Sequence, residues 1–218
     1  RLCADLVEGF KRHGVDVHAS LASRDIGLLP ADLTVIVGVR RSSYRLYKAA
    51  QEAGQQIVML DKGYFNRGKY HRISVGSPQP SYISKVTEDS SRFDSIMPNA
   101  THHDRNGDPR TILYVESTQK YYNFHELGDV TEYSANVCAQ LRTVVARAKP
   151  YLSVVYRPRK APTGEPLPVP RGTVLADPVA MRELFKPAHC VVVHGSNAGV
   201  EALVAGVTLL VMTQSFQF

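Results

Sequence analysis

The spacing of apolar residues in the first third of the chain predicts two helices and three strands. Residues 2–14 carry apolar side chains at helical spacing and end in a glycine, which predicts an amphipathic helix. Residues 15–20 alternate like a half-buried strand, whereas residues 32–39 form a β-branched run typical of a strand covered on both faces. A helix over residues 43–54 and a buried strand over residues 55–64 follow. Buried strands joined by a helix favour a parallel, doubly wound sheet.

The middle of the chain has the composition of loops. Residues 66–110 are rich in Gly, Pro, Asn and basic residues, with one short strand expected at residues 72–75. This composition predicts a long loop region that ends in an interdomain linker near residues 104–109. We therefore expect an N-terminal domain over residues 1–108 and a C-terminal domain over residues 109–218.

The α/β pattern returns in the C-terminal domain. Asp129 or Thr131 is expected to cap a long helix, and Asp177 to cap a short one. Both halves follow the βαβ pattern, so the sequence predicts two Rossmann-like lobes with a ligand cleft between them. Strands are expected at residues 111–117, 151–160, 173–175, 190–193 and 207–212, and helices at 129–148, 177–185 and 198–206.

Composition excludes several classes of protein. Hydrophobic residues make up 44% of the 218 residues and charged residues 21%, and no apolar run is long enough to predict a membrane-spanning helix. Cys3, Cys138 and Cys190 lie far apart, which argues against a disulfide framework or a structural zinc and favours the reducing cytoplasm. The chain opens inside a helix and stops just after a strand, so we expect both ends to be truncated.

Polar and basic residues follow three strands of the C-terminal domain. Ligands of open α/β sheets bind beyond the carboxyl ends of the strands. Hydroxyl groups, a small-residue turn and cations at such an edge suit a diphosphate, because a glycine allows close approach and Arg pairs with phosphate oxygens. The residues concerned are Ser117, Gln119 and Lys120 after the first strand, Arg157, Arg159 and Lys160 after the second, and His194, Gly195, Ser196 and Asn197 after the third.

Glu201 extends this candidate site. It lies four residues past Asn197 on the next expected helix, where its carboxylate can accept hydrogen bonds from two ribose hydroxyls. A solvated surface glutamate is the alternative interpretation, and both stay open at this point.

The stretch from residue 190 to residue 212 resembles the donor-binding half of GT-B glycosyltransferases and of the related UDP-sugar 2-epimerases. It has a strand, a Gly/Ser turn, the small-residue helix "VEALVAG" and the strand "VTLLVM". In those families a glutamate five residues before the helix-ending glycine binds the ribose, and Glu201 and Gly206 have this spacing. The segments "DKGYFNRGKYHRISVGSPQPSYI", "STQKYYNFHELGD" and "VVYRPRK" are similar to bacteriophage-encoded glycosyltransferases.

The resemblance implies a hexosyltransferase that uses a UDP-sugar, UDP-glucose first, and needs no further cofactor. Some phage enzymes of this type modify hydroxymethylpyrimidines such as hydroxymethylcytosine in the phage's DNA, within the cytoplasm of the infected host. The net charge of +6 and the pI of about 9.3 fit a DNA acceptor. Three alternatives stay open: a surface-polysaccharide glycosyltransferase, a UDP-sugar 2-epimerase, and a non-catalytic module that binds nucleotide sugars.

Asp61 is the first candidate for a catalytic base, because it ends a strand of the N-terminal domain and would face the cleft. Capping of the turn that follows is an equally good interpretation. His18 and Asp25 are weaker candidates, His125 could contact the donor, and a retaining enzyme needs no such base.

An acceptor surface is expected in the loop "KGYFNRGKYHR", which alternates aromatic and basic residues as nucleic-acid-binding surfaces do. A solvated loop is the alternative. No metal site is expected, because the sequence has no Asp-x-Asp motif and the histidines at 102–103 lack a second ligand cluster. The acceptor-binding candidates are Tyr64, Arg67, Lys69 and Arg72.

Overall fold

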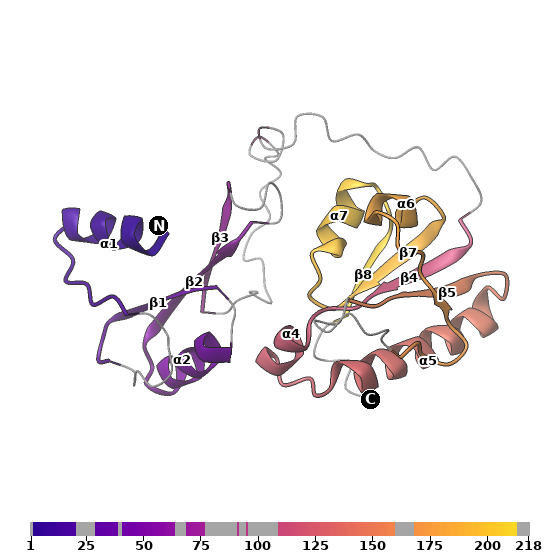
Figure 1. Cartoon of the computed structure of the whole chain (residues 1–218), viewed down its shortest axis with the longest axis horizontal. Helices are drawn as coiled ribbons and strands as arrows, with labels where there is room; N and C mark the ends of the chain where they lie inside the picture. The colour runs from indigo at the N-terminus through magenta and orange to yellow at the C-terminus, as the bar shows by residue number, and fades with distance from the viewer. Residues whose placement is uncertain are drawn as a thin grey trace. The chain divides into compact units, whose positions relative to one another are not determined.

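A computed structural model describes residues 2–20, 29–38, 41–63, 69–76, 91, 95, 109–159 and 168–212 (Figure 1). The chain divides into two compact units, a first unit over Arg1–Thr87 and a second unit over Glu88–Phe218. Most residues between this division and the expected linker lie outside the described residues, so the expected boundary after residue 108 stays a prediction.

The first unit is built on a three-stranded sheet in the order β1-β2-β3. β1 (Leu33–Val37) and β2 (Gln56–Lys62) are parallel and are joined by α2 (Arg41–Glu52), as the sequence predicts. β3 (His71–Val75) pairs with β2 in the antiparallel direction, so the expectation of a fully parallel sheet is wrong for this unit.

The N-terminal segment differs in part from the expectation. Residues 2–12 form helix α1 (Leu2–Arg12), as their spacing predicts. The strand expected at residues 15–20 is absent, since these residues have no regular secondary structure. A period-two pattern over six residues is too short to form a strand without a partner in a sheet.

The two faces of the first sheet differ in burial. Alternate residues of β1 and β2, Ile36, Ile57 and Met59, are buried on one face, and α2 packs on these two strands. The opposite face exposes Leu33 and Val37 of β1 together with Ile73 and Val75 of β3, which are 67% and 69% exposed. The prediction that β1 is covered on both faces is therefore wrong.

The second unit contains a five-stranded sheet in which every pairing is parallel. Its strands lie in the order β6-β5-β4-β7-β8, which is 3-2-1-4-5 in the order of this unit's chain. That order is the one found in Rossmann-type nucleotide-binding domains. The strands are β4 (Thr111–Val115), β5 (Ser153–Arg157), β6 (Val174–Leu175), β7 (Ala188–Val193) and β8 (Leu209–Val211).

Helices cover both faces of this sheet (Figure 1). α5 (Val130–Ala148) packs on one face, where Tyr114, Cys138 and Tyr156 belong to a buried cluster. α6 (Met181–Phe185) and α7 (Ala198–Val204) pack on the other, where Leu113, Val191 and Ala202 belong to a second cluster. The alternation of side chains along β4 and β7 supplies apolar residues to both layers.

Two local features of the second unit depart from the sequence analysis. A short helix, α4 (Gln119–Phe124), follows β4 where no element was predicted, and Thr118 caps it by accepting a hydrogen bond from the Tyr121 backbone N–H. α6 begins three residues later than predicted, with Ala180 rather than Asp177 at its N-cap. α5 is capped by Asp129, one of the two residues proposed for that position. Among the described residues no helix is long and apolar enough to cross a membrane.

Candidate functional site

The strand order places the candidate site at the carboxyl edge between β4 and β7. The connection from β4 leads through α4 and α5 to one face of the sheet, and the connection from β7 leads through α7 to the other. Such a reversal of direction leaves a crevice at the carboxyl ends of the two strands, where α/β proteins bind ligands. β5, β4 and β7 are neighbours, so the three strand ends identified in the sequence do lie side by side.

The turn after β7 has backbone donors without acceptors. Gly195 adopts a φ of 68°, which brings the chain sharply from strand to helix. Among the described residues, the backbone N–H groups of Gly195, Ser196 and Asn197 have no hydrogen-bond acceptor, whereas the Ser196 carbonyl and hydroxyl accept from Gly199 and Ala198. Three consecutive N–H groups form a surface that can bind an anion.

Ser117 lies at the corresponding point after β4. Only 6% of the residue is exposed, and its hydroxyl has no hydrogen-bond partner in the part of the chain that the structure describes. Since no buried side-chain polar atom of the described residues lacks a partner, this hydroxyl is open to solvent and can meet a ligand atom in the crevice.

Tyr121 of α4 lies directly against the turn. A Cβ atom built on Gly195 would lie 2.0 Å from Cζ of the Tyr121 ring, so any other residue would require this ring to move. The ring also stands edge-on to His194 at a centroid distance of 5.6 Å and lies 4.2 Å from the ring of His125. The close approach that the sequence analysis assigned to a diphosphate is thus partly made by a tyrosine of the same unit.

His194 is a buried, neutral imidazole. Only 4% of the residue is exposed, and its Nδ1 lies 2.7 Å from the hydroxyl of Tyr133 on α5. Burial, with a smaller contribution from nearby His125, lowers the pKa of His194 to about 4. Burial also lowers the pKa of His125. His194 therefore acts near neutral pH as a hydrogen-bonding group and not as a cation.

A buried hydrogen-bond network that the sequence analysis missed lies beneath the carboxyl edge. Glu116, the residue after β4, accepts hydrogen bonds at Oε1 from the hydroxyls of Ser134 and Tyr156 and at Oε2 from the backbone N–H of Arg159. The Tyr114 hydroxyl lies 3.2 Å from those of Ser134 and Tyr122. The network ties β4, β5, α4 and α5 together at the edge that carries the candidate site. A carboxylate at the end of an otherwise apolar strand was the available signal.

This network and its burial alter the titration of nearby groups. Burial, aided by the charge of Glu116, raises the pKa of Cys138 to about 12. Burial is also the first cause of the raised pKa values of Tyr114, Tyr122 and Tyr156. These groups stay protonated at neutral pH, so the tyrosines serve as hydrogen-bond donors.

Two of the predicted donor-binding side chains make contacts within the protein. Gln119 donates to Asn123 and to the carbonyl of Gly128, and it accepts from the Val130 N–H, so it braces the turn between α4 and α5. The Arg157 guanidinium donates to the carbonyls of Asp177 and Val179 at 2.6 and 3.2 Å. It therefore positions the segment before α6.

The other predicted donor-binding residues stand as follows. Lys120 is exposed at the start of α4, and Glu201 is exposed on α7. Lys160 lies outside the described residues. The roles of all these residues in binding a donor stay predictions.

In the first unit, two predicted site residues meet each other. Asp61 Oδ2 lies 3.6 Å from a guanidinium nitrogen of Arg72 on the neighbouring strand, and Asp61 Oδ1 accepts from the Lys62 backbone N–H. Lys69 is exposed, with its ammonium 5.5 Å from the centre of the Tyr70 ring. His18 is exposed, whereas Tyr64, Arg67 and Asp25 lie outside the described residues.

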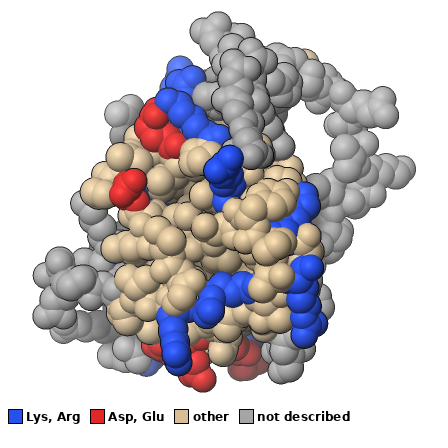
Figure 2. Space-filling model, turned by 90° about the vertical axis from the view of Figure 1, so that its right-hand side faces the viewer, with Lys and Arg blue, Asp and Glu red and all other residues tan. Residues whose placement is uncertain are grey.

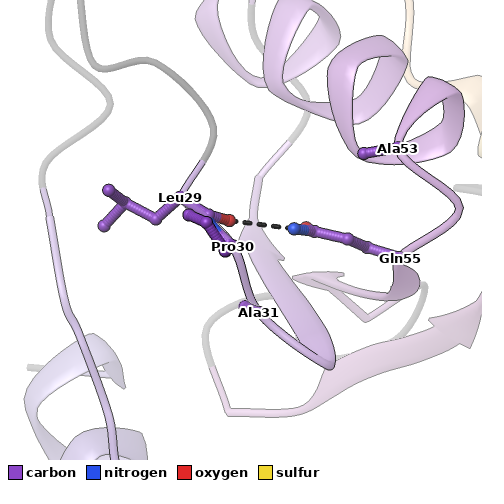
Figure 3. A pocket seen from close by; sticks show the side chains of 5 residues that line it. All are labelled: Leu29, Pro30, Ala31, Ala53 and Gln55. Atoms are coloured by element: carbon purple, nitrogen blue, oxygen red, sulfur yellow. Dashed lines mark hydrogen bonds between the residues drawn. The ribbon is translucent and has the colours of Figure 1, made fainter.

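A shallow depression also occurs in the first unit, lined by residues at the start of β1 and β2 (Figure 3). The side chain of Gln55 crosses it, donating to the carbonyl of Leu29 and accepting from the hydroxyl of Thr34. Both polar atoms of the Gln55 side chain therefore have partners, and the other residues that line the depression have no polar side chain. Among the described residues, no group of three His, Cys, Asp or Glu side chains is placed to hold a metal ion.

Comparison with protein families and with curated proteins finds no match. Among solved structures, the chain is similar to KpsC, the beta Kdo 2,4 transferase of Thermosulfurimonas dismutans. The sequence identity is 10% and the TM-score 0.49, over 82% of this chain and 68% of that one. A similarity at this level defines neither a family nor an activity.

Proposed function

We propose that this chain is a glycosyltransferase that binds a nucleotide sugar, UDP-glucose first, at the carboxyl edge between β4 and β7. The observation that carries the proposal is the set of donors at this edge. The N–H groups of residues 195–197 and the Ser117 hydroxyl have no partners among the described residues. A diphosphate supplies several acceptor oxygens in a small volume, which matches such a set.

The basic residues at the same edge have two different roles in this proposal. Lys120 would reach the diphosphate directly, as would Lys160, and would stabilise the charge that develops on the leaving group. Arg157 would act through the carbonyls it binds, by fixing the segment that follows β6. Glu116 anchors the backbone at Arg159 and so holds the start of this basic segment in place.

Glu201 is the proposed ribose ligand. α7 ends at Val204 and is capped by Ala205, whose N–H donates to the carbonyl of Glu201, and Gly206 with a φ of 66° follows the cap. Glu201 thus lies in the last turn of this helix, five residues before the glycine. The exposed position of Glu201 leaves its carboxylate accessible to a ligand.

The first unit is the proposed acceptor-binding part. It contains 13 Lys and Arg against 7 Asp and Glu, so it accounts for the whole net charge of +6, whereas the second unit contains 13 of each. A charge of this sign favours DNA as the acceptor, with a hydroxymethylated pyrimidine as the reacting base. Asp61 is the proposed general base, and the Arg72 guanidinium would hold its carboxylate in place until the acceptor hydroxyl arrives.

Thermal unfolding with UDP, UDP-glucose and UDP-GlcNAc tests the donor site. Binding at one hundred times the Kd stabilises the folded state by about 2.7 kcal/mol, so a rise in Tm is expected with at least one of them. The shift should be lost in Glu201→Ala and retained in Glu183→Ala, a matched carboxylate on α6. Unchanged melting with all three compounds would refute the donor site.

A transfer assay then separates the proposed reaction from its alternatives. The protein is incubated with UDP-glucose and with duplex DNA that contains either hydroxymethylcytosine or cytosine, and the nucleosides are analysed by mass spectrometry. A hexose on the hydroxymethylated nucleoside alone is expected. Turnover of UDP-GlcNAc without an acceptor would instead identify an epimerase, and binding without turnover a non-catalytic module.

A further inference from the structure

The amino edge of the second sheet, opposite the candidate site, carries an ordered set of cations. Four of the five parallel strands are each preceded, within four residues, by an exposed Lys or Arg. Because parallel strands all begin at the same edge, these residues lie along one side of the unit. We call them the basic row: Arg171 before β6, Lys149 before β5, Arg110 before β4 and Lys186 before β7.

The strand order fixes the sequence of charges in space. Neighbouring strands run β6, β5, β4, β7, so the row reads Arg171, Lys149, Arg110, Lys186 across the sheet. Adjacent strands lie about 4.8 Å apart, which gives a row of roughly 14 Å. A nucleic-acid strand carries one phosphate per about 3.4 Å of helix axis, so the row matches the length of about four nucleotides.

Backbone hydrogen bonds hold the segments of the row together. The N–H groups of Arg110 and Thr111 both donate to the carbonyl of Pro187, and the Ser153 N–H donates to the carbonyl of Arg110. Arg142 of α5 donates to the carbonyl of Arg171. The backbone segments that carry these cations are therefore held by hydrogen bonds, which lowers the conformational entropy that is lost when a ligand binds.

Further charges on this side have the same sign. Arg142 and Arg147, both exposed, lie on the part of α5 that leads to this edge. Glu183, five residues before β7, pairs with Lys186. Figure 2 looks onto this end of the second unit, and Lys and Arg side chains surround a largely uncharged centre, with Asp and Glu towards the margins.

We propose that the basic row binds the phosphodiester backbone of a nucleic acid. A linear polyanion can neutralise all four cations at once, and Tyr151, which lies between Lys149 and β5 and is 58% exposed, offers a ring on which a base can stack. An anionic membrane surface is the alternative ligand, and the test below separates it from nucleic acid. This inference goes beyond sugar transfer and concerns residues separate from the proposed acceptor residues Lys69 and Arg72.

The test is the salt dependence of binding to a 30-base-pair DNA duplex by the full chain. The row variant is Lys149→Gln/Arg171→Gln/Lys186→Gln, which changes only exposed side chains. The matched control, Lys120→Gln/Arg159→Gln/Arg182→Gln, removes three exposed cations of the second unit that lie outside the basic row. Each lost phosphate contact reduces the slope of log Kobs against log salt by about 1, so the row variant should have a slope shallower by about 3. The control should keep the slope of the wild type.

Three results would overturn the inference: equal slopes for the row variant and the wild type, equal losses in both triple variants, or binding to phosphatidylserine vesicles with none to DNA. Circular dichroism of each variant confirms that it is folded. The outcome is separable from the proposed function. A row variant that loses DNA binding while UDP-glucose still raises Tm supports the row, and a normal slope with intact sugar transfer refutes the row alone.

Discussion

The two units are built from the same kinds of element but differ in how completely their sheets are covered. The second unit buries both faces of a five-stranded parallel sheet, and Leu113, Val191 and Val192 are almost fully buried in it. The first unit has three strands, and one face exposes apolar side chains of β1 and β3. Stability in the second unit should therefore depend on packing, and packing on the exposed face of the first should matter little.

The two units also differ in net charge, and here the first unit has the larger value. The first unit carries the entire net charge, whereas the second is neutral overall, with cations at both edges of its sheet and a buried carboxylate beneath the carboxyl edge. The difference in charge and packing indicates that the two units bind different kinds of ligand. The well-packed unit can hold donors in fixed positions for a small ligand, and the basic unit can attract a large polyanion.

Two truncations, one in each sheet, test the difference in packing with the largest expected effect. Leu113→Ala, in β4, should reduce the free energy of unfolding by about 2–5 kcal/mol, because it opens a cavity in a layer where this residue is 1% exposed. Ile73→Ala, on the exposed face of β3, should cost less than about 1 kcal/mol. Urea unfolding followed by circular dichroism measures both. Equal losses would show that the first sheet is covered as completely as the second.

The buried network predicts a loss of similar size at one residue. Glu116→Ala leaves the hydroxyls of Tyr156 and Ser134 and the Arg159 N–H without their acceptor, which should cost about 2–4 kcal/mol. Glu132→Ala, an exposed carboxylate on the first turn of α5, should cost less than about 1 kcal/mol. A small loss of unfolding free energy in Glu116→Ala would mean that water replaces the carboxylate and can enter the hydrogen-bond network.

Glycines with a positive φ allow a comparison between the units. Gly195→Ala adds a Cβ to a residue with a φ of 68° and drives it into the Tyr121 ring, which should cost about 2–4 kcal/mol. Gly38→Ala in the first unit has a φ of 79° but open space around the new Cβ, so only backbone strain of about 1–2 kcal/mol is expected. Adding Tyr121→Ala to Gly195→Ala should recover part of the loss in thermal unfolding. No recovery would show that Tyr121 does not cause the cost.

His194 should make the second unit sensitive to acid. Its pKa is about 4 in the folded protein and about 6.5 when unfolded, so between these values the unfolded chain binds the proton first. Stability is complete above pH 6.5 and falls by up to about 3 kcal/mol as the pH drops to 4. The change is measured by urea unfolding at pH 7.5, 5.5 and 4.5, and His194→Gln should reduce it. A His194→Gln profile identical to that of the wild type would contradict the assignment.

The smallest change in stability is expected for Asp61→Asn. The ion pair with Arg72 is partly exposed, and such pairs contribute about 0.2–1 kcal/mol. If Asp61 is the general base, the rate of sugar transfer should nevertheless fall by about 10²–10⁴. Circular dichroism melting and the nucleoside assay together separate the two effects. A normal transfer rate would leave Asp61 as a structural residue of the β2–β3 pair.

The second unit could largely be predicted from sequence because each of its strong strands is a continuous apolar run followed by polar residues. The strands predicted at residues 111–117, 151–160 and 190–193 are observed as β4, β5 and β7, and the strand order places their ends side by side. α4 escaped prediction because it is one and a half turns long and depends on the Thr118 cap and on Gln119, which contacts residues 123, 128 and 130. Periodicity cannot reveal a helix of that length.

The contacts within the candidate site could not be derived from the sequence. The roles of Gln119 and Arg157 depend on carbonyl groups that only the folded backbone brings near them. Likewise, strand propensity does not encode the antiparallel pairing of β3 with β2. Tyr121 at Gly195 is a contact between residues 74 positions apart, and a turn motif read alone assigns that space to a ligand.

The most direct test of the central claim is an NMR titration of the ¹⁵N-labelled chain with UDP-glucose. If the nucleotide sugar binds at the edge between β4 and β7, the amide resonances of Gly195, Ser196 and Asn197 should shift in a saturable way, because their N–H groups gain phosphate acceptors. Those of Ile73 and Val75 in the first unit should not move. Amides of residues 195–197 that stay unchanged at saturating UDP-glucose would contradict the account.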